Sequence, residues 1–392
     1  MHPDTMNVGI LTLHNNRNKG SLLQNYRLRE TVRELAPDAT VRTIDYRCRS
    51  HEFKRIKNSL ITKQLDAVPA RVRDFIRTER FAKEFCALTE ERLISDDYDR
   101  SKDFVEEFGF DVVLVGSDTV WKVEDGFRNR FSGQRPFPNV YFWGDGLSAD
   151  AVAYAASANK TRLEALSASE RRLFGRLLEG FSAIGVRDSH TAEMLDELDI
   201  DAYERVPDPT LLGELPSPDV SAHLEHREID LDANVLGVNA STAPTIARLV
   251  DRFRAGGYQV VAPNDSPYAD AGFVGRLDPF EHYSIHGAFD FMITSSLHST
   301  IFCLLQKTPF LTVDVDETYS AVTSKTKSLL TDFEMEHRHI DGFATDPSDI
   351  PLEDLYELDD SERERIDRTV TELRYVGRTF LSTALDSTRN ER

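Results

Sequence analysis

The stretch FDFMITSSLHST, residues 289–300, decides the fold. Its first five residues, Phe289–Ile293, form a short apolar run that is typical of a buried strand. A small, polar turn follows, and a helical pattern continues over Ser299–Leu305. This order predicts a strand, a tight loop and a helix, which is the repeating unit of a parallel α/β sheet.

The same unit recurs toward the N-terminus, where short apolar runs alternate with amphipathic stretches. Ser167 and Glu170 have the spacing of a capping box, which predicts that a helix begins there and continues to about residue 178. The strands expected in this half are Val8–Leu13, Val41–Tyr46, Asp111–Val115, Val152–Ala156 and Ile184–Val186, with further helices at Leu22–Leu35 and Ser189–Glu197.

A change in composition divides the chain. Residues 213–233 are rich in charge, contain prolines and lack an apolar period, so we expect a linker there. The alternation then restarts, and it ends in a long amphipathic helix over residues 361–385, with a second capping-box pattern from Ser361 to Glu364. The elements expected after the linker are strands at Val235–Val238, Tyr258–Ala262, Phe289–Ile293 and Phe310–Val315, with helices at Thr245–Ala255, Pro279–His286 and Ser299–Leu305.

These patterns predict an α/β protein with two Rossmann-like domains that face each other across a cleft. The expected divisions are an N-terminal domain (1–215) with a helical insertion at about 50–105, a C-terminal domain (216–360) and a C-terminal helix (361–392). In parallel sheets, ligands bind at the carboxyl ends of the strands. We therefore expect the chemistry in the loops that follow the strands.

The charge of the chain indicates its environment and limits the partners that it can bind. The net charge is −20, and the 47 basic residues comprise 36 Arg and 11 Lys. An acidic, lysine-poor chain favours a halophilic protein, because high salt screens the repulsion between surface carboxylates. An acidic protein from an ordinary cytoplasm is the alternative. We expect no nucleic-acid partner, because so acidic a chain repels phosphates.

The location is predicted from what the sequence lacks. No apolar run has the length of a membrane span, and no signal-peptide pattern is present, so we expect a soluble, cytoplasmic protein. Cys48, Cys86 and Cys303 are widely spaced, which argues against disulfides and structural zinc. Residues 42–83, however, hold 12 basic against 5 acidic residues. This basic segment is suited to contact an anionic acceptor or the lipid headgroups of the inner membrane face. The alternative is a solvated helix face.

Two loops of the first half carry candidate ligand-binding residues. Asn16 and Lys19 precede the first helix, whose free N–H groups can bind an anion. Ser117 and Asp118 follow a buried strand, where Asp118 can orient or deprotonate a sugar hydroxyl and Trp121 can stack on a sugar ring. The alternative is structural, with a helix cap at Ser117 or Asp118 and Trp121 in the core.

A third loop contributes a cation. Arg187 follows the strand Ile184–Val186, and a guanidinium there can bind a carboxylate or a phosphate through paired hydrogen bonds. A structural ion pair with a neighbouring acid or with Asp208 is the alternative.

The polar end of the opening stretch is the strongest candidate site. Ser295, Ser296, His298 and Ser299 gather at the start of a helix in the ligand-facing position. Histidine can donate a proton near neutral pH, although a histidine at a helix start can also be a plain cap. The common nucleotide-binding, metalloprotease and hydrolase motifs are absent, and the remaining histidines lack a ligand set, so we expect no metal.

Several of these segments, in this order, resemble the polysaccharide pyruvyl transferase family. Together they span roughly residues 7–330, and the ordered set is more specific than any one segment. The matching segments are Gly9–Thr12, Asn15–Gly20, Leu23–Gln24, Val113–Trp121, Ala153–Ser157, Val186–Asp188, Pro207–Thr210 and Phe289–Phe310. The resemblance implies a glycosyltransferase-B-like fold and transfer of a pyruvyl group from phosphoenolpyruvate to a sugar, with no separate cofactor.

The resemblance also suggests roles for single residues. Leu297–His298 matches the histidine motif of the family, so His298 is expected to be catalytic, and Arg187 matches a basic position expected to hold the donor. Asp118 is a candidate base. Ser296 stands where some members have an arginine, and Ser299 stands where glycine is frequent. Donor binding then depends on Arg187 and another cation, or the donor differs.

Two other functions remain open from the sequence. One is a glycosyltransferase of the same two-domain shape that uses a nucleotide sugar. The other is a carbohydrate-binding family member without activity, for which Ser296 is the one sequence hint. The acceptor, whether a free sugar, a polymer or a lipid-linked glycan, is not specified by the sequence.

Overall fold

The computed structural model of the chain describes residues 5–15, 18–60, 67–123, 135–142, 147–230 and 232–390. The chain forms two compact units. The first comprises residues 1–68, 78–214 and 372–392, and the second comprises residues 69–77 and 215–371. The chain passes from one unit to the other after Glu214 and within two helices, α3 (Val68–Phe85) and α12 (Asp360–Asn390).

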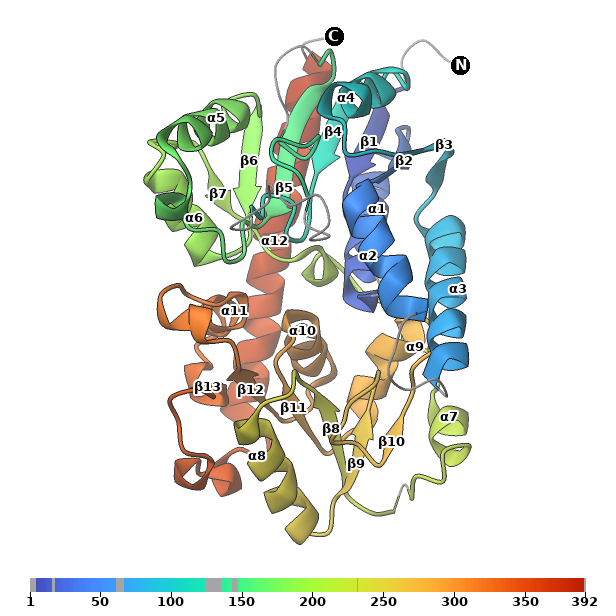
Figure 1. Ribbon diagram of the computed structural model, residues 1–392, viewed down its shortest axis with the longest axis vertical. Coiled ribbons are helices and arrows are strands. Elements are labelled where there is room, and N and C mark those ends of the chain that lie inside the picture. Colours follow the sequence, from blue (N-terminus) through green and yellow to red (C-terminus); the bar gives the residue numbers. More distant parts are fainter. Residues whose placement is uncertain are drawn as a thin grey trace. The chain divides into compact units, whose positions relative to one another are not determined.

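The first unit is built on a parallel sheet of seven strands (Figure 1). Its order is β3-β2-β1-β4-β5-β6-β7, which extends the Rossmann order by one strand. The strands are β1 (Asn7–Leu11), β2 (Thr40–Arg47), β3 (Leu88–Ile94), β4 (Val112–Val115), β5 (Asp150–Ala156), β6 (Ala183–Val186) and β7 (Glu204–Arg205). The helices that begin and end in this unit are α1 (Lys19–Leu35), α2 (Arg49–Leu60), α4 (Tyr98–Glu106), α5 (Ala168–Leu178) and α6 (Ser189–Asp196).

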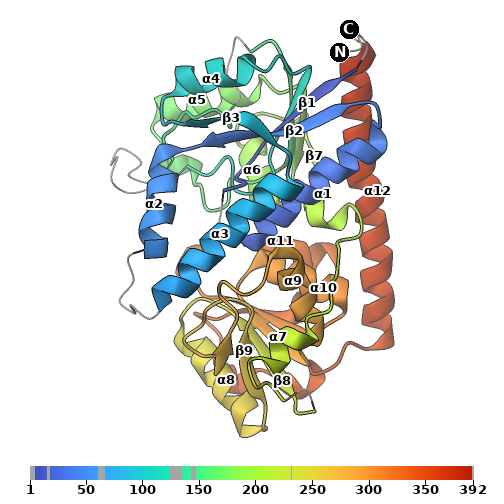
Figure 2. The same ribbon diagram turned by 90° about the vertical axis from the view of Figure 1, so that its right-hand side faces the viewer.

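Alternate residues of the central strands face two separate cores, as expected for a sheet covered on both sides. Val113 and Val115 of β4 pack in the core that contains side chains of α4, α5 and α6. Val112 and Leu114 pack in the core that contains side chains of α1 and the last turns of α12. Figure 2 shows α2 and α3 following β2 along the chain.

The segment expected to be a helical insertion, at about residues 50–105, also contains a strand. β3 pairs in parallel with β2 and forms one edge of the sheet. Three consecutive charged residues of this strand, Glu90, Glu91 and Arg92, are exposed. Charged side chains are frequent on edge strands, because they discourage pairing with other chains, and here they hide the strand pattern.

The second unit has a parallel sheet of six strands in the order β10-β9-β8-β11-β12-β13. Counted from β8, this is again the Rossmann order. The strands are β8 (Val235–Asn239), β9 (Gln259–Ala262), β10 (Ala271–Gly272), β11 (Phe291–Thr294), β12 (Phe310–Asp314) and β13 (His339–Asp341). The helices are α7 (Ser221–Glu225), α8 (Pro244–Ala255), α9 (Pro279–Ser284), α10 (Leu297–Gln306) and α11 (Lys325–Asp332).

The capping box of α5, Ser167 with Glu170, is confirmed. The one expected for α12, Ser361 with Glu364, is wrong. The Asp359 carboxylate accepts from the Glu362 N–H at 2.8 Å, and the Glu362 carboxylate accepts from the Asp359 N–H at 3.1 Å. Aspartate caps a helix as well as serine does, so the capping residue lies two residues earlier than expected.

The two sheets confirm the predicted α/β class with two Rossmann-like units. No helix within the described residues is both long and apolar enough to cross a membrane. Each sheet has a switch point, where the strand order reverses, between β1 and β4 and between β8 and β11. Ligands of such sheets bind outside the carboxyl ends of the strands at the switch point.

Candidate functional site

The loop after β4 comes close to the neighbouring strand at the first switch point. Gly116 has a φ of +123°, and a Cβ at this position would lie 2.2 Å from the carbonyl oxygen of Tyr154. Glycine is therefore required here. The hydroxyl of Thr12, which follows β1, donates to the carbonyl oxygen of Ser117 at 3.3 Å and ties the two loops together.

Asp118 is held firmly at this edge. Its φ is 73°, a left-handed conformation that aspartate tolerates better than most residues. One carboxylate oxygen accepts from the hydroxyl of Ser21 on α1 at 2.7 Å, and the other accepts from the Thr119 N–H at 2.8 Å. Its backbone also bridges to Ala156 of β5. Two hydrogen bonds thus fix the carboxylate, and the β-bridge fixes the backbone that carries it.

Arg187 lies beside Asp118 at the end of β6. Its Nη1 donates to the carboxylate of Asp208 at 2.8 Å, and its Nη2 lies 4.0 Å from Asp118. The side chain is 6% exposed. Burial alone would lower the pKa of Arg187, but the carboxylates of Asp208, Asp118 and Asp188 outweigh it and raise that pKa. The guanidinium therefore remains charged.

This cluster contains buried polar atoms without a hydrogen-bond partner among the described residues. They include Nε and Nη2 of Arg187 and the hydroxyl of Ser117. Gln24 of α1 donates its Nε2 to Asp208 at 2.5 Å, while its Oε1 is likewise unpartnered. Buried polar groups are nearly always satisfied, so such atoms at one sheet edge point to a ligand. We call Ser21, Gln24, Asp118, Arg187 and Asp208 the first-sheet cluster.

The other candidates of the first unit lie in different settings. Lys19 is buried, with 2% of its surface exposed, in the first turn of α1, and the Asn18 side chain caps that helix. Asn16 lies outside the described residues. Trp121 is fully buried; its Nε1 donates to the carbonyl oxygen of Tyr141 at 3.1 Å, and its ring packs edge-on against Phe181. The burial of the ring argues against the sugar-stacking role and favours the core alternative.

A buried ionic network anchors the loop after β1. His14 lies 3.0 Å from the carboxylate of Asp45, which also accepts from Arg47 and Arg92 at 2.8 and 2.7 Å. Burial alone would raise the pKa of Asp45, but His14 and the two guanidinium groups hold it well below its ordinary value. Through the carboxylate of Asp45, the network ties the loop that precedes α1 to β2.

The second switch point carries the predicted cluster of hydroxyl groups. Ser295 and Ser296 are half-buried between β11 and α10. The hydroxyl of Ser295 accepts from the Ser241 N–H at 3.0 Å, and the Thr294 hydroxyl donates to the Asn239 carbonyl oxygen at 3.0 Å. Ser296 is the N-cap residue of α10, but its side chain makes no capping hydrogen bond. The loops after β8 and β11 are therefore tied together, as in the first unit.

Three further residues form what we call the second-sheet network: Asn239, His286 and Ser299. The hydroxyl of Ser299 accepts from Asn239 Nδ2 at 2.7 Å and lies 3.0 Å from His286 Nε2. His286 Nδ1 lies 2.8 Å from the carbonyl oxygen of His282. Burial lowers the pKa of His286 to about 4. The imidazole is therefore neutral, with Nδ1–H donating to the carbonyl oxygen and Nε2 accepting from Ser299.

His298 lies in the first turn of α10 and is 5% exposed. Its ring packs near Phe302 of the same helix, with centroids 6.2 Å apart. The next residue, Ser299, is 1% exposed and committed to the second-sheet network. This position favours a supporting role for Ser299 over the predicted contact with substrate.

Sequence reasoning did not select Gln24, Asn239 or His286 as site residues. Asn239 directly follows the expected strand Val235–Val238, which is a usable signal. The other two lie on helices and touch the site only through contacts that the fold creates. Among the described residues, one group has the geometry of a metal site. Asp314, His339 and Asp341 place ligand atoms within 4.8 Å of one another, and His339 Nε2 is 2.9 Å from Asp314.

Comparison with known proteins identifies the family. A sequence model of the family described as polysaccharide pyruvyl transferase matches residues 18–317. That range includes both the first-sheet cluster and the second-sheet network. None of the curated proteins matches the chain.

Solved structures resemble the chain in fold at low sequence identity. A putative UDP-N-acetylglucosamine 2-epimerase from Listeria monocytogenes is 10% identical, with a TM-score of 0.51 over 93% of this chain and 90% of that one. UGT71G1 from Medicago truncatula, solved with UDP-glucose, is 12% identical, with a TM-score of 0.48 over 98% of each chain. The first likeness confirms the two-domain glycosyltransferase-B-like class of fold.

Proposed function

This chain belongs to the polysaccharide pyruvyl transferase family and is a transferase, and we propose that it moves the pyruvyl group of phosphoenolpyruvate onto a sugar. The acceptor is a sugar of a cell-surface polysaccharide or of a lipid-linked glycan precursor. Phosphoenolpyruvate brings its own leaving group, so the reaction needs no separate cofactor. The reaction takes place in the cytoplasm, at high salt, and residues 42–83 provide a peripheral contact with the inner membrane face.

One observation carries the proposal: the buried guanidinium of Arg187 has two nitrogens without a hydrogen-bond partner among the described residues. Both N–H groups are available to a carboxylate or a phosphate, and hydrogen bonds between charged groups are the strongest of their kind. The Ser117 hydroxyl, also without a partner among those residues, adds a donor. Asp208 and Asp118 keep the guanidinium in place and charged before the donor binds.

The chemistry requires an acid, a base and a cation. In the proposed sequence, the methylene carbon of phosphoenolpyruvate gains a proton, and positive charge develops at C2. A sugar hydroxyl attacks C2 and loses its proton, the C2–O bond to phosphate breaks, and inorganic phosphate leaves. A second hydroxyl of the same sugar attacks C2, gives its proton to the departing phosphate and closes the ketal. The product retains the pyruvate carboxylate and a new methyl group.

Named residues fill these roles. His298, in the first turn of α10, is the proposed acid. The N-terminus of this helix attracts anions, and a bound anionic donor would in turn favour the protonated form of the His298 ring. Asp118 is the proposed base, and its hydrogen bonds from Ser21 and Thr119 orient it. Arg187 binds the donor. Lys19, Ser295 and Ser296 remain candidates for substrate contacts in their own loops.

The test is a transfer assay at high salt with phosphoenolpyruvate and a panel of sugars, monitored by phosphate release and by acceptor mass. We expect one acceptor to gain the mass of a pyruvate ketal. His298→Ala is expected to lower kcat by about 10²- to 10⁴-fold, the usual contribution of a general acid. His226→Ala, which removes an exposed histidine of the same unit, is the matched control and should behave as wild type.

Direct binding of phosphoenolpyruvate by calorimetry covers the case in which no acceptor in the panel is correct. Binding of a nucleotide sugar without binding of phosphoenolpyruvate would overturn the proposal in favour of a nucleotide-sugar glycosyltransferase. Binding of sugars alone, with no transfer, would favour a carbohydrate-binding member without activity.

A further inference from the structure

Helix α2 buries the charged pair Glu52 and Arg55 and exposes the large apolar residues Phe53 and Ile56. The buried face presents Glu52 and Arg55, which pair at 2.6 Å. Glu52 also accepts from Asn15 Nδ2 at 2.7 Å, and Arg55 lies 3.0 Å from Glu79. A surface helix ordinarily buries its apolar stripe against the core. Here ion pairs attach the helix to the first unit and leave its apolar residues in solvent.

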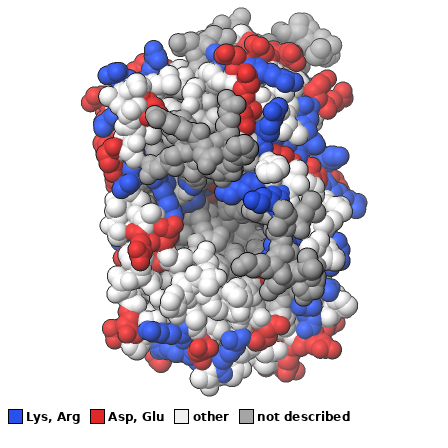
Figure 3. Space-filling view, in the orientation of Figure 1, with Lys and Arg blue, Asp and Glu red and all other residues white. Residues whose placement is uncertain are grey.

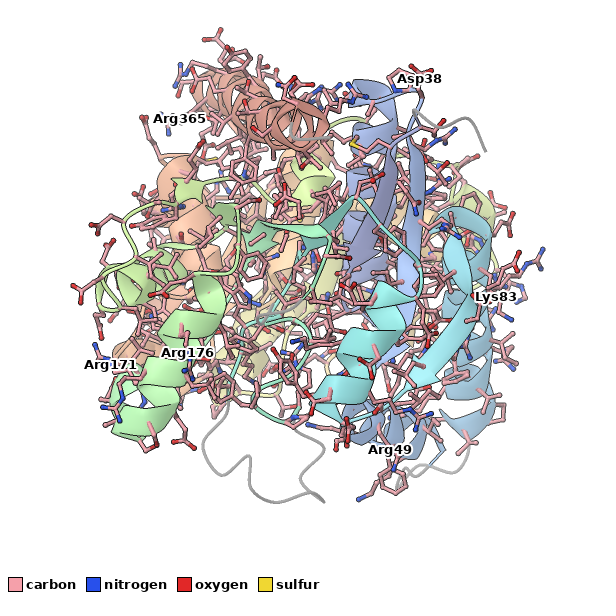
Figure 4. All side chains as sticks on the ribbon, turned by 90° about the horizontal axis from the view of Figure 1, so that it is seen from above. Asp38, Arg49, Lys83, Arg171, Arg176 and Arg365 are labelled. Atoms are coloured by element: carbon pink, nitrogen blue, oxygen red, sulfur yellow. The ribbon has the colours of Figure 1, made fainter. Side chains whose placement is uncertain are left out.

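The outward face of α2 consists of Phe53, which is 69% exposed, Ile56, which is 40% exposed, and three exposed cations, Arg49, Lys54 and Lys57. Figure 4 shows Arg49 projecting away from the helix. Phe53 and Ile56 are three residues apart and therefore lie side by side on one face. The one acid of α2, Glu52, points inward. We call these five residues the outward face.

The positive charge of the outward face contrasts with the net negative charge of the chain. The chain has a net charge of −20, and acidic and basic side chains are mixed over the surface seen in Figure 3. The outward face combines three cations with an aromatic and a branched apolar side chain and carries no carboxylate. A helix that presents aromatic and aliphatic residues flanked by Lys and Arg is suited to the interface of an anionic bilayer.

We propose that the outward face of α2 docks on an anionic membrane surface, with Phe53 and Ile56 among the headgroups and Arg49, Lys54 and Lys57 against lipid phosphates. Charge complementarity favours a bilayer, because the cations are gathered around the apolar pair. The ion pairs of Glu52 and Arg55 present the face in a fixed orientation. This docking rests on the membrane contact proposed above for residues 42–83, assigns it to α2, and would bring the protein to acceptors carried on lipids.

Electrostatic attraction and apolar insertion both contribute to docking, and they respond differently to salt concentration. The attraction of each cation to an anionic surface changes partitioning about fivefold at moderate salt, and the effect falls off within a Debye length. At about 1 M salt that length is about 3 Å, so the electrostatic part is largely lost. Insertion of Phe53 and Ile56 is apolar and persists, or strengthens, at high salt.

The test is vesicle flotation with the full chain, using equal parts phosphatidylcholine and phosphatidylglycerol, with pure phosphatidylcholine for comparison. We expect the wild type to float with the anionic vesicles at low salt. The double variant Phe53→Ser/Ile56→Ser should lose at least about tenfold in partitioning at every salt concentration. Lys54→Glu/Lys57→Glu should lose at least about 25-fold at low salt and little at high salt.

Tyr375→Ser is the matched control, because Tyr375 is an aromatic residue of α12 with 73% exposure. It should float as the wild type does. All substituted positions are exposed, and thermal melts should confirm that each variant folds. No floating of the wild type, or equal floating of the Phe53→Ser/Ile56→Ser variant, would overturn the proposal.

A dimer in light scattering that Phe53→Ser abolishes, without any lipid binding, would also overturn it and make the outward face an interface between two copies. Flotation needs neither phosphoenolpyruvate nor an acceptor. Its failure would contradict the membrane contact proposed for residues 42–83 but would leave the proposed pyruvyl transfer standing. A failed transfer assay would leave the docking proposal standing.

Discussion

The first-sheet cluster and the second-sheet network occupy equivalent positions, the switch points of two Rossmann-like sheets, yet they differ in charge. The first-sheet cluster buries a guanidinium among carboxylates and retains donors without partners among the described residues. The second-sheet network is neutral, and each of its hydrogen bonds has a defined donor and acceptor. Topology sets where a ligand can bind, whereas the buried side chains set which ligand is suited to it.

The difference suggests a division of work. Charged donors without partners are suited to binding an anion, since a ligand completes their hydrogen bonds. A neutral and satisfied network is suited to holding the start of α10, which carries His298, in one conformation. Removing a charge from the first-sheet cluster should therefore lower the free energy of unfolding. Adding a charge to the second-sheet network should lower it as well.

Removal of the guanidinium has the largest expected effect. Arg187→Met leaves the carboxylates of Asp208 and Asp118 buried without their counter-ion. Breaking a buried pair on one side costs about 3–5 kcal/mol. We expect a loss of that size in the free energy of unfolding, measured with urea at pH 7 and high salt, together with loss of phosphoenolpyruvate binding.

A second substitution separates stability from binding. Arg187→Met/Asp208→Asn removes both charges, and the side chain of Gln24 can turn so that its unpartnered Oε1 accepts from the new amide. This variant should recover most of the stability and none of the donor binding. If Arg187→Met alone is as stable as the wild type, the buried carboxylates do not need the guanidinium. Charge would then not distinguish the first-sheet cluster from the second-sheet network.

Addition of charge to the second-sheet network has the next largest effect. The pKa of His286 is about 4 in the folded protein and 6.5 ordinarily, so between these values the unfolded chain binds the extra proton. The stability contributed by neutral His286 is therefore fully present above pH 6.5 and is lost as the pH falls toward 4. The gap corresponds to about 3 kcal/mol, at about 1.4 kcal/mol for each unit of pKa.

The measurement is the free energy of unfolding at pH 7 and at pH 4.5 for the wild type and for His286→Asn. Burial also lowers the pKa of His51 to about 4, so both proteins should weaken in this range. Between pH 7 and pH 4.5, the free energy of unfolding should fall more for the wild type than for His286→Asn. Equal losses would mean that His286 is charged, or solvated, in the folded protein, and the second-sheet network would no longer count as neutral.

Both switch points were predictable from the sequence because their signals are local. An apolar run followed by small polar residues indicates a strand end, which led to Asp118, Arg187 and His298. Strands of two or three residues, such as β7, β10 and β13, are too short to show a period. The charged edge strand β3 was missed because its exposed residues are those of a helix surface.

The contacts of the supporting residues could not be predicted, because these contacts join distant parts of the chain. Ser21 and Asp118 are 97 residues apart, and Gln24 and Asp208 are 184 apart. Polar residues on an amphipathic helix are read as its solvent side, although on α1 they are buried. Trp121 shows the reverse problem, since its sequence position is equally suited to a sugar platform and to the core in which it lies.

The smallest expected effect distinguishes two serines of one site. Ser21 donates its hydroxyl proton to Asp118, whereas the Ser117 hydroxyl has no partner among the described residues. Removing a hydrogen bond to a charged group costs about 1.5–3 kcal/mol. Ser21→Ala should therefore lower the free energy of unfolding by that amount. Ser117→Ala should leave it unchanged or raise it, because a buried polar group without a partner is itself destabilising.

For the affinity for phosphoenolpyruvate, the order of the two variants should be reversed, with the larger effect at Ser117. If the Ser117 hydroxyl is kept for the anion that Arg187 binds, Ser117→Ala weakens phosphoenolpyruvate binding by about tenfold, while Ser21→Ala changes it little. Calorimetric titration of both variants measures the two affinities. A Ser117→Ala protein that binds phosphoenolpyruvate as the wild type does would mean that the unpartnered hydroxyl serves neither stability nor the donor. The free nitrogens of Arg187 would then be the sole remaining sign of an anion at the first sheet within the described residues.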